Sequence, residues 1–495
     1  MQLSLLALCA SVSLSTFAMD FSPVEKLINE TKAVTNLPSG TAIAVVKGDK
    51  IIYQGYFGYA DIANKKHVDE NTSFYIASIT KPYFALSMLL KEKQGQLSEN
   101  SNLTSLFPTS TFSGFDASKV TVKQLLTHTM GIGNKPLVIA TAYTGQHDEK
   151  VRQRLVGKSY VNEEFPLGSF DYSNLGYNIL SVWSDKADNM PWQDMLKQTV
   201  LTPLQTSHSS AYISDAKKNS WQLAKPYSIT NGKDKPVYLE KRDNTMHAAG
   251  GMISSAKDMA NFLIVQLNQG ELHGTQVFPS KIIEKSQQKI TEVDSSYGDF
   301  KREGYAWGWY IGPYMNETMY HHFGGYAGTH SHLSFMPEKG LGVVILNNED
   351  RLSSKLTGAV AKSIYATLLN KPEAIAQAQA MATAVQKKAA QLPSRLKKQQ
   401  EKMAKRQWQL SLAKTEYSGS YLHPEYGQVN IKHNEKGQLL VSWGYTHAIA
   451  TAFTKPETIR VELIQSRGQI ISFQLENQKV TGFTFNKAEF TKTIN

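Results

Sequence analysis

The chain has 495 residues, of which 41% are hydrophobic and 19% are charged, with 33 glycines and 17 prolines. This composition is typical of globular proteins and excludes collagen-like, low-complexity and disordered chains. The formal net charge is +11, and no later part of the chain approaches the roughly 18 to 20 consecutive apolar residues of a membrane-spanning helix. We therefore expect a soluble protein, or one that is tethered only by its N-terminus.

The first 18 residues read as a secretory signal. Leu3 to Leu14 is an apolar stretch of the usual length, and Ser15-Thr16-Phe17-Ala18 provides a cleavage site after Ala18. The basic residues that normally open such a signal are missing, so a buried first helix is the alternative. Cys9 is the only cysteine and lies in this segment. The mature chain, which we expect to be periplasmic or secreted, would then have no disulfide, cysteine nucleophile or thiolate metal site.

Residues 19–370 mix strands and helices and form the predicted catalytic domain. Two hairpins lie near the two ends of this domain, and helical stretches fill much of the middle. The predicted elements are strands at 42–46 and 51–59, strands at 332–336 and 341–347, and a helix at 353–369. The economical arrangement is one largely antiparallel sheet built from both ends of the domain, with helices packed against it. We therefore predict an α+β fold.

A basic segment at residues 371–414 follows and is predicted to be a helical linker. Nine basic and two acidic residues lie between Lys371 and Leu410, so this segment carries seven of the eleven net positive charges. Pro393 is expected to kink or split the helix. No aromatic residues interleave with these charges before Trp408, which disfavours nucleic acid as a partner. The charges are interpreted as a solvated helix face, with contact to an anionic envelope surface as the alternative.

Residues 415–495 carry almost only strand signals. Val429 and Ile431 alternate with polar residues, and the same period recurs at Ile471 and Phe473. About 80 residues of short strands predict a small β-barrel or sandwich. No catalytic constellation is present in this part of the chain.

A nucleophile in a thiol-free chain is a serine or threonine, and a serine needs a base. Ser-x-x-Lys supplies one, because residues three apart share a helix face. Six copies of this pattern occur, and Ser78-Ile79-Thr80-Lys81 alone follows a strand-like segment and opens an amphipathic helix. The free N–H groups of a helix N-terminus also suit a developing oxyanion. The alternative role for Ser78 is that of a helix-capping residue.

Two further elements complete the candidate site. In Tyr172-Ser173-Asn174 a phenol beside an ammonium can relay a proton, and an amide two residues later can orient both lysine and substrate. The second element is His322-Phe323-Gly324-Gly325, the one His-x-Gly in the chain, whose glycines let a substrate backbone approach a strand closely. Each element is weak by itself, and their combination is strong.

Together these elements resemble the penicillin-recognising serine hydrolases: class C β-lactamases, DD-peptidases, D-aminopeptidases and related esterases. Leu125 to Ile132, with the sequence LLTHTMGI, is similar to the usual LLTHTSGL of that family. Ala249-Gly250-Gly251-Met252, followed by Asp258, resembles its AGGL…D segment. The resemblance covers about residues 25–368. Residues 415–495 resemble the small, lipocalin-like barrel appended to some family peptidases, and open with YSGSY at 417–421.

The resemblance implies a role for each residue of the candidate site. Ser78 would be the acylated nucleophile, Lys81 its base partner and Tyr172 the general acid or base, while which of Lys81 and Tyr172 takes the proton stays open. The substrate-binding residues would be Asn174, His322, Gly324 and Gly325, and the oxyanion hole would be the N–H groups of Ser78 and Gly325. No cofactor and no metal are implied.

Histidine in the third element is more typical of the peptidase and esterase branches of the family. The sequence therefore favours a secreted serine hydrolase that cleaves peptide or amide bonds of D-amino-acid or cell-wall-like peptides through an acyl-enzyme. A carboxylesterase or β-lactamase of the same family, or a non-catalytic penicillin-binding module, are the alternatives. The expected partner is a small peptide or ester substrate, and self-association is compatible with the sequence.

Other histidines are also candidates for functional roles. His321, His322, His330 and His332 form a tract in which a metal site is conceivable, but no nearby carboxylate pattern supports one. His128 is expected to satisfy the backbone of a turn, and His247 is not assigned.

Overall fold

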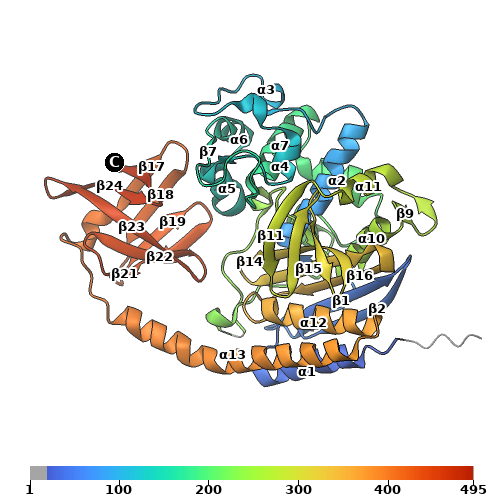
Figure 1. The fold of residues 1–495 in the computed structure, drawn as a ribbon. Helices are drawn as coiled ribbons and strands as arrows, with labels where there is room; N and C mark the ends of the chain where they lie inside the picture. Colours follow the sequence, from blue (N-terminus) through green and yellow to red (C-terminus); the bar gives the residue numbers. More distant parts are fainter. Residues whose placement is uncertain (1–18, 233, 494–495) are drawn as a thin grey trace, which may run out of the picture.

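The computed structural model describes residues 19–232 and 234–493. The predicted signal, residues 1–18, lies outside the described residues. Figure 1 shows a large α+β body, a long helix that leaves it, and an all-β unit at the C-terminal end. Within the described ranges, no helix combines the length and the apolar character that a membrane crossing requires.

The body is built on one antiparallel sheet of eight strands in the spatial order β11-β12-β13-β14-β15-β16-β1-β2. Its strands are β1 (Thr41–Lys47), β2 (Lys50–Phe57), β11 (Thr291–Tyr297), β12 (Phe300–Tyr305), β13 (Tyr310–Tyr314), β14 (Glu317–Tyr326), β15 (Thr329–Met336) and β16 (Leu341–Asn347). Because β1 pairs with β16, the two ends of the domain meet in the middle of the sheet. The predicted α+β fold with a largely antiparallel sheet is confirmed.

Both faces of this sheet are covered, and side chains alternate between two cores. Ala42 and Ala44 face one core, while Ile43 and Val45 face the other. Helix α10 (Ala256–Leu267) packs on the first face; α12 (Ser353–Leu368) packs on the second, where α1 (Ser22–Thr35) lies against it. This burial on both faces explains why β1 and β16 are almost continuously apolar.

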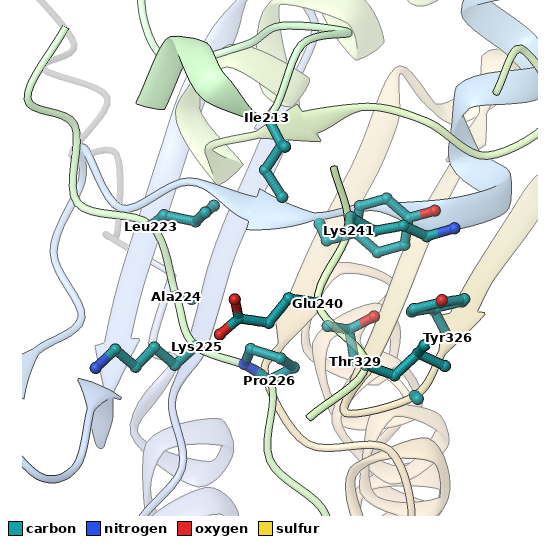
Figure 2. Close-up of a pocket in the computed structure, with 12 residues that line it drawn as sticks. Ile213, Leu223, Ala224, Lys225, Pro226, Glu240, Lys241, Tyr326 and Thr329 are labelled. Carbon is teal, nitrogen blue, oxygen red and sulfur yellow. The ribbon is translucent and has the colours of Figure 1, made fainter. Parts of the chain in front are cut away.

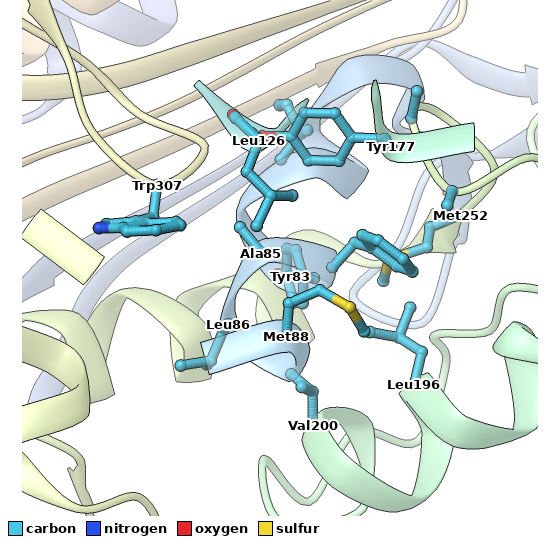
Figure 3. Packing of buried hydrophobic residues seen from close by; sticks show 14 of the residues in the cluster. Tyr83, Ala85, Leu86, Met88, Leu126, Tyr177, Leu196, Val200, Met252 and Trp307 are labelled. Atoms are coloured by element: carbon cyan, nitrogen blue, oxygen red, sulfur yellow. Dashed lines mark hydrogen bonds between the residues drawn. The ribbon is translucent and has the colours of Figure 1, made fainter. Parts of the chain in front are cut away.

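Helix α2 (Thr80–Lys93) runs through the middle of the helical half of the body. Side chains from several helices and loops surround it, as Figure 3 shows for Leu126, Leu196 and Met252. The neighbouring helices are α3 (Leu103–Leu106), α4 (Val122–Leu126), α5 (Lys135–Ile139), α6 (Glu149–Val156), α7 (Leu175–Ala187), α8 (Trp192–Leu196), α9 (Ser214–Lys218) and α11 (Ser280–Gln287). Because α2 is buried almost all round, its first turn is held at a fixed place in the fold.

Short strands connect these helices. They are β3 (Tyr59–Asp61), β4 (Lys66–His67), β5 (Phe74–Tyr75), β6 (Ile132–Gly133), β7 (Tyr160–Val161), β8 (Ile253–Ser254), β9 (Glu271–Leu272) and β10 (Thr275–Gln276). The pair formed by β5 and β8 matters most for function, because it brings residue 253 next to the chain that leads into α2.

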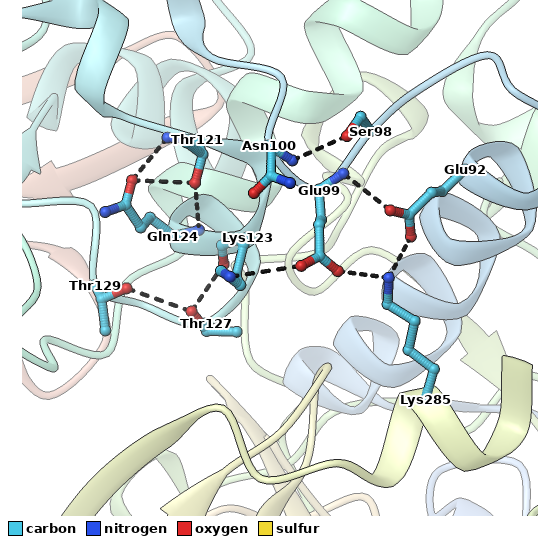
Figure 4. Close-up of polar contacts among 10 residues, drawn as sticks. All are labelled: Glu92, Ser98, Glu99, Asn100, Thr121, Lys123, Gln124, Thr127, Thr129 and Lys285. Atoms are coloured by element: carbon cyan, nitrogen blue, oxygen red, sulfur yellow. Dashed lines mark hydrogen bonds and ion pairs between the residues drawn. The ribbon is translucent and has the colours of Figure 1, made fainter.

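A network of charged side chains anchors the C-terminal end of α2. The ammonium of Lys285 lies 2.7 Å from a carboxylate oxygen of Glu92 and 2.5 Å from one of Glu99, and Lys123 reaches Glu99 at 3.5 Å (Figure 4). Hydrogen bonding to Lys285 holds the pKa of Glu99 below its usual value. The network joins α2 to α4 and α11, so the helix that carries Lys81 is held at its C-terminal end by two neighbouring helices.

The basic segment forms one helix, α13 (Pro372–Ala404). The helix is not split at Pro393, because helical structure continues through this residue, and the alternative of a kink stays a prediction. Proline removes one hydrogen bond, the one to the carbonyl four residues earlier, and the turns on either side of Pro393 retain theirs. The N-terminal part of α13 packs against α1 and α12 through small residues that include Ala378 and Ala382, so this part is anchored.

The C-terminal unit is a nearly closed antiparallel barrel of nine strands, in the order β20-β19-β18-β17-β25-β24-β23-β22-β21. The strands are β17 (Gly419–His423), β18 (Gly427–His433), β19 (Leu439–Trp443), β20 (Thr446–Ile449), β21 (Thr451–Ala452), β22 (Thr458–Ile464), β23 (Arg467–Glu476), β24 (Lys479–Phe485) and β25 (Ala488–Lys492). Val429 and Ile431 point into its core together with Phe473 and Phe483, as their alternation predicted. The predicted small β-barrel is therefore present.

Candidate active site

Ser78 lies in the short 3-10 turn η1 (Ala77–Ile79), between strand β5 and helix α2. The sequence placed Ser78 at the start of a helix, and in the structure α2 itself begins two residues later, at Thr80. The residue before the serine, Ala77, has a φ of 47°, a left-handed conformation that is costly for a residue with a Cβ. Ala77 is buried, so the surrounding packing holds the turn in this conformation.

The side chain of Lys81 is completely buried beside Ser78. Its Nζ lies 3.3 Å from the Ser78 Oγ, 2.8 Å from the Asn174 Oδ1 and 2.8 Å from the carbonyl oxygen of Ala249. No carboxylate of the described residues forms an ion pair with it. Because burial removes water and nothing negative replaces it, the pKa of Lys81 is held well below its usual value.

The contacts of Lys81 can also be satisfied by a neutral amine, the form that its lowered pKa favours. An uncharged amine has two N–H donors and one lone pair. The Asn174 Oδ1 and the Ala249 carbonyl oxygen accept the two hydrogens, since neither atom can donate. The lone pair is left for the remaining neighbour, the Ser78 hydroxyl. The arrangement therefore suits removal of a proton from Ser78.

Tyr172 and Asn174 come from the loop that leads into α7. The Lys81 Nζ lies 4.7 Å from the centre of the Tyr172 ring, and the Ser78 hydroxyl lies beside the Tyr172 phenol. Burial of the phenol raises the pKa of Tyr172 well above its usual value, and the neighbouring phenol of Tyr310 acts in the same direction. The phenol is therefore protonated at neutral pH and can donate a proton.

His128 contacts the loop that carries Tyr172 and Asn174. The backbone N–H of Ser173 donates to its Nδ1 at 3.2 Å, so the ring proton lies on Nε2, which faces the hydroxyl of Tyr305 at 3.1 Å. The ring also packs 4.6 Å from that of Tyr172. The prediction that His128 satisfies a backbone group is confirmed, and the group belongs to the residue directly after Tyr172.

Strand β14 carries His322, Gly324 and Gly325 past the Ser78 turn. Its pairing with β13 ends at His321, whereas its pairing with β15 continues to Tyr326. From His322 onward the β14 edge on the β13 side therefore has no strand partner within the described residues. Such an edge presents main-chain N–H and C=O groups to an extended ligand.

The two glycines have different surroundings. A Cβ on Gly324 would lie 2.0 Å from the carbonyl oxygen of Ile76 and 2.3 Å from the Oγ of Ser331, so the strand and the Ser78 turn approach each other as closely as glycine permits. A Cβ on Gly325 would meet nothing within 4 Å. The N–H of Gly325 stays the predicted second oxyanion donor beside that of Ser78.

His322 is buried and neutral. Its Nδ1 donates to the carbonyl oxygen of Phe323 at 2.8 Å, and its Nε2 has no protein partner among the described residues. Burial lowers the pKa of His322 well below its usual value. His322 therefore offers the site a hydrogen-bond acceptor, not a positive charge.

Sequence reasoning missed the cation that lies at this end of the site. The guanidinium of Arg302, on β12, lies 3.6 Å from the centre of the Tyr310 ring, and its charge acts on Tyr172 and His322. Within the described part of the chain it forms no ion pair, and its buried Nε has no hydrogen-bond partner. One arginine in an ordinary strand gives no sequence signal, so only the tertiary structure could identify it.

The remaining histidines have structural surroundings. His247 is buried, with its Nδ1 3.2 Å from the Oδ1 of Asn178, behind the Ala249 segment that accepts from Lys81. Over residues 19–232 and 234–493, no group of three or more His, Cys, Asp and Glu side chains is arranged to hold a metal ion. The histidine tract instead contributes to aromatic packing, as between His332 and Phe323.

The comparison with protein families agrees with this geometry. A family model described as Beta-lactamase matches residues 30–363. Among curated proteins, Protein flp of Staphylococcus aureus (strain N315) is 24% identical over 353 residues, which are 70% of this chain. The chain covers 66% of that relative's length, slightly under two thirds. Penicillin-binding protein 4* of Bacillus subtilis (strain 168) is 31% identical over 179 residues, 35% of this chain and 38% of that protein.

Solved structures share the fold. The octameric penicillin-binding protein homologue from Pyrococcus abyssi matches with a TM-score of 0.59 and 22% identity, over 96% of this chain and all of that one. The D-amino acid amidase from Ochrobactrum anthropi SV3, solved with L-phenylalanine amide, matches with a TM-score of 0.53 and 19% identity, over 66% of this chain and 90% of that one.

The glycine pair provides a test of how tightly the site is packed. Gly324→Ala is expected to lower the free energy of unfolding by roughly 1–3 kcal/mol, the usual cost of forcing extra atoms into a packed interior. Gly325→Ala is the matched control, because its added methyl group would point into open space. Thermal unfolding of the two variants measures the difference. Equal melting temperatures for both would show that β14 and the Ser78 turn are not in contact as described.

Proposed function

The chain belongs to the Beta-lactamase family, whose members are usually serine hydrolases, and on that premise we propose that it cleaves amide bonds of small peptides through an acyl-enzyme on Ser78. The observation that carries this proposal is the environment of Lys81: a buried amine with a lowered pKa, free of any carboxylate partner among the described residues, with its Nζ 3.3 Å from the Ser78 Oγ.

In the first half of the reaction Lys81 takes the proton of Ser78 as its Oγ attacks the substrate carbonyl carbon. The negative charge that develops on the carbonyl oxygen is bound by the N–H groups of Ser78 and Gly325. Tyr172 donates its phenolic proton to the leaving nitrogen and recovers a proton from Lys81. The C–N bond breaks, the amine departs, and the acyl group stays on Ser78.

In the second half a water molecule replaces the amine. Its proton passes to the neutral Lys81 as its oxygen attacks the acyl carbon, and the Ser78 Oγ leaves with that proton returned from Lys81. The open edge of β14 holds the substrate main chain in the same position during both halves, since the strand does not need to move. Asn174 keeps Lys81 oriented throughout.

Arg302 favours a substrate with a free carboxylate. His322 is neutral and presents an acceptor, so it cannot bind an anion in this state, whereas the guanidinium of Arg302 has no acidic partner among the described residues. A guanidinium pairs with a carboxylate through two parallel hydrogen bonds. We therefore favour peptides that end in a carboxylate next to the scissile bond, such as D-amino-acid or cell-wall-like peptides.

Location and assembly belong to the same proposal. The apolar N-terminal segment is consistent with export, and a substrate of the cell-wall type would be met in the periplasm or outside the cell. The Pyrococcus abyssi homologue is described as octameric, which makes self-association a reasonable expectation for this chain.

The nucleophile is tested by covalent labelling. Intact mass after exposure to a fluorophosphonate, and separately to a penicillin, is expected to rise by a single adduct in the wild-type protein and not in Ser78→Ala. Lys81→Met, which keeps the length of the side chain but has no base, should slow labelling at least a hundredfold. No adduct from either reagent would favour a non-catalytic binding module.

The identity of the base is tested by the pH dependence of fluorophosphonate labelling. Lys81 reacts when it is neutral, that is, above its lowered pKa, so labelling should be slow in acid and reach its maximum well below the amine's ordinary pKa of 10.5. Tyr172, with its pKa raised from 10.0, stays protonated over this range. A rate that rises only above pH 10.0 would instead identify the Tyr172 phenolate as the base.

The role of Arg302 is tested with N-acetyl-D-alanyl-D-alanine and its C-terminal amide. Arg302→Leu is expected to reduce kcat/KM for the free acid about tenfold or more, the value of one lost charge-assisted hydrogen bond. The amide should be affected much less. Arg302→Lys keeps the charge and serves as the matched control, with an intermediate loss. Equal losses on both peptides would contradict recognition of a carboxylate.

A further inference from the structure

A cavity of about 340 Å³ lies beside the Ser78 turn, at the end of the site opposite to Arg302. Figure 2 shows residues from several segments that converge on it. Its lining is mostly apolar and includes Tyr75, Ile213, Leu223, Pro226, Leu239 and Tyr326. A cavity of this size and lining is typical of sites for small apolar groups.

Two aromatic walls connect this cavity to the reacting groups. Tyr75 precedes Ser78 by three residues, and its hydroxyl donates to the carbonyl oxygen of Gly250. Tyr326 directly follows Gly325 on β14. The rings of Tyr75 and Tyr326 meet edge to face, with centres 5.4 Å apart. The cavity therefore begins where the open edge of β14 ends.

The position of the cavity along β14 determines which part of the substrate it receives. A substrate strand on this edge would have its scissile carbonyl at Gly325, with Arg302 toward the His322 end and the cavity toward the Tyr326 end. If the terminal carboxylate, which belongs to the leaving group, is bound by Arg302, the cavity faces the acyl part. It would then take the side chain next to the scissile carbonyl.

A buried lysine fixes one of these walls. The Lys241 Nζ lies 4.0 Å from the centre of the Tyr326 ring and donates to the carbonyl oxygens of Ala142 at 2.6 Å and Thr245 at 3.2 Å. It has no acidic partner among the described residues, and burial lowers its pKa to about 7. Because main-chain acceptors and aromatic faces already surround the amine, it packs against the Tyr326 ring and leaves the adjoining surface apolar.

The barrel contacts the segment around Leu239, which forms the outer wall of the cavity. Leu239 follows Tyr238, whose hydroxyl donates to the carbonyl oxygens of Leu463 and, at 3.3 Å, Glu462 in β22. The Tyr238 ring also packs 4.8 Å from that of His447 in β20. The segment that closes the cavity is thus attached to the C-terminal unit as well as to the catalytic body.

We propose that this cavity is the subsite for an apolar side chain on the acyl side of the scissile bond, with its outer wall set by contact with the barrel. The inference rests on the proposed acyl-enzyme function and adds to it the chemical class of the acyl group. An aromatic or branched aliphatic side chain fits a lining that is mostly apolar.

The test uses full-length protein and two esters that differ only in the acyl group, p-nitrophenyl acetate and p-nitrophenyl phenylacetate. The wild-type protein is expected to have the higher kcat/KM for the phenylacetate. Ile213→Trp fills the cavity from a half-buried position and should reduce the phenylacetate-to-acetate ratio about tenfold. Leu223→Trp fills the cavity from another wall and should reduce the same ratio, so it serves as the second variant if Ile213→Trp does not fold. Ile449→Trp, the same change on the exposed face of β20, should keep the wild-type ratio.

Fluorophosphonate labelling of Ser78 in each protein separates the two hypotheses. Labelling together with a reduced ratio in the filled variants supports the subsite. Labelling with no preference for the phenylacetate in the wild type, or with an unchanged ratio in folded filled variants, overturns this inference and leaves the acyl-enzyme proposal intact. No labelling of the wild-type protein overturns the proposed function, and the subsite falls with it.

Discussion

The burial of one amine without a countercharge is the constraint on which this structure depends. A lysine side chain in an apolar interior is costly as an ammonium, and the fold reduces this cost by keeping Lys81 neutral and giving its two hydrogens to Asn174 and to the carbonyl of Ala249. Each partner comes from a different part of the chain. Helix α2, the loop before α7 and the segment after residue 248 must therefore all be in place before the amine is satisfied.

The rest of the body holds these segments in their positions around Lys81. Helix α2 is enclosed by apolar side chains and anchored at its far end by Lys285 and the two glutamates that it contacts. Strand β14 approaches the Ser78 turn to a distance that only Gly324 allows, and Ala77 holds a conformation that alanine normally avoids. Strain and close packing of this kind are typical of sites where geometry must not vary.

Much of the fold could be predicted from the sequence because its signals are local. Hairpins at both ends of the domain predicted the antiparallel sheet, and alternating apolar residues predicted the barrel. Ser78 and Lys81 are three residues apart, so one helical turn suffices to bring them together. Arg302, the Ala249 carbonyl and the apolar cavity depend on contacts between distant segments, and no local pattern reports them. Of the two effects expected at Pro393, a kink or a split, the split is absent because a long helix tolerates the loss of one hydrogen bond when its other turns are intact.

The attachment of Tyr238 to the barrel has a kinetic consequence. The barrel is joined to the catalytic body by α13 and also contacts it through the Tyr238 segment and through Tyr445, whose N–H donates to the carbonyl of Thr144. A wall held from two folding units can swing outward only if this second attachment is released. Escape of a bulky acid from the cavity would then require transient separation of the barrel from the body. For bulky acyl groups, the turnover rate would be limited by this interdomain motion, while small acyl groups would leave without it.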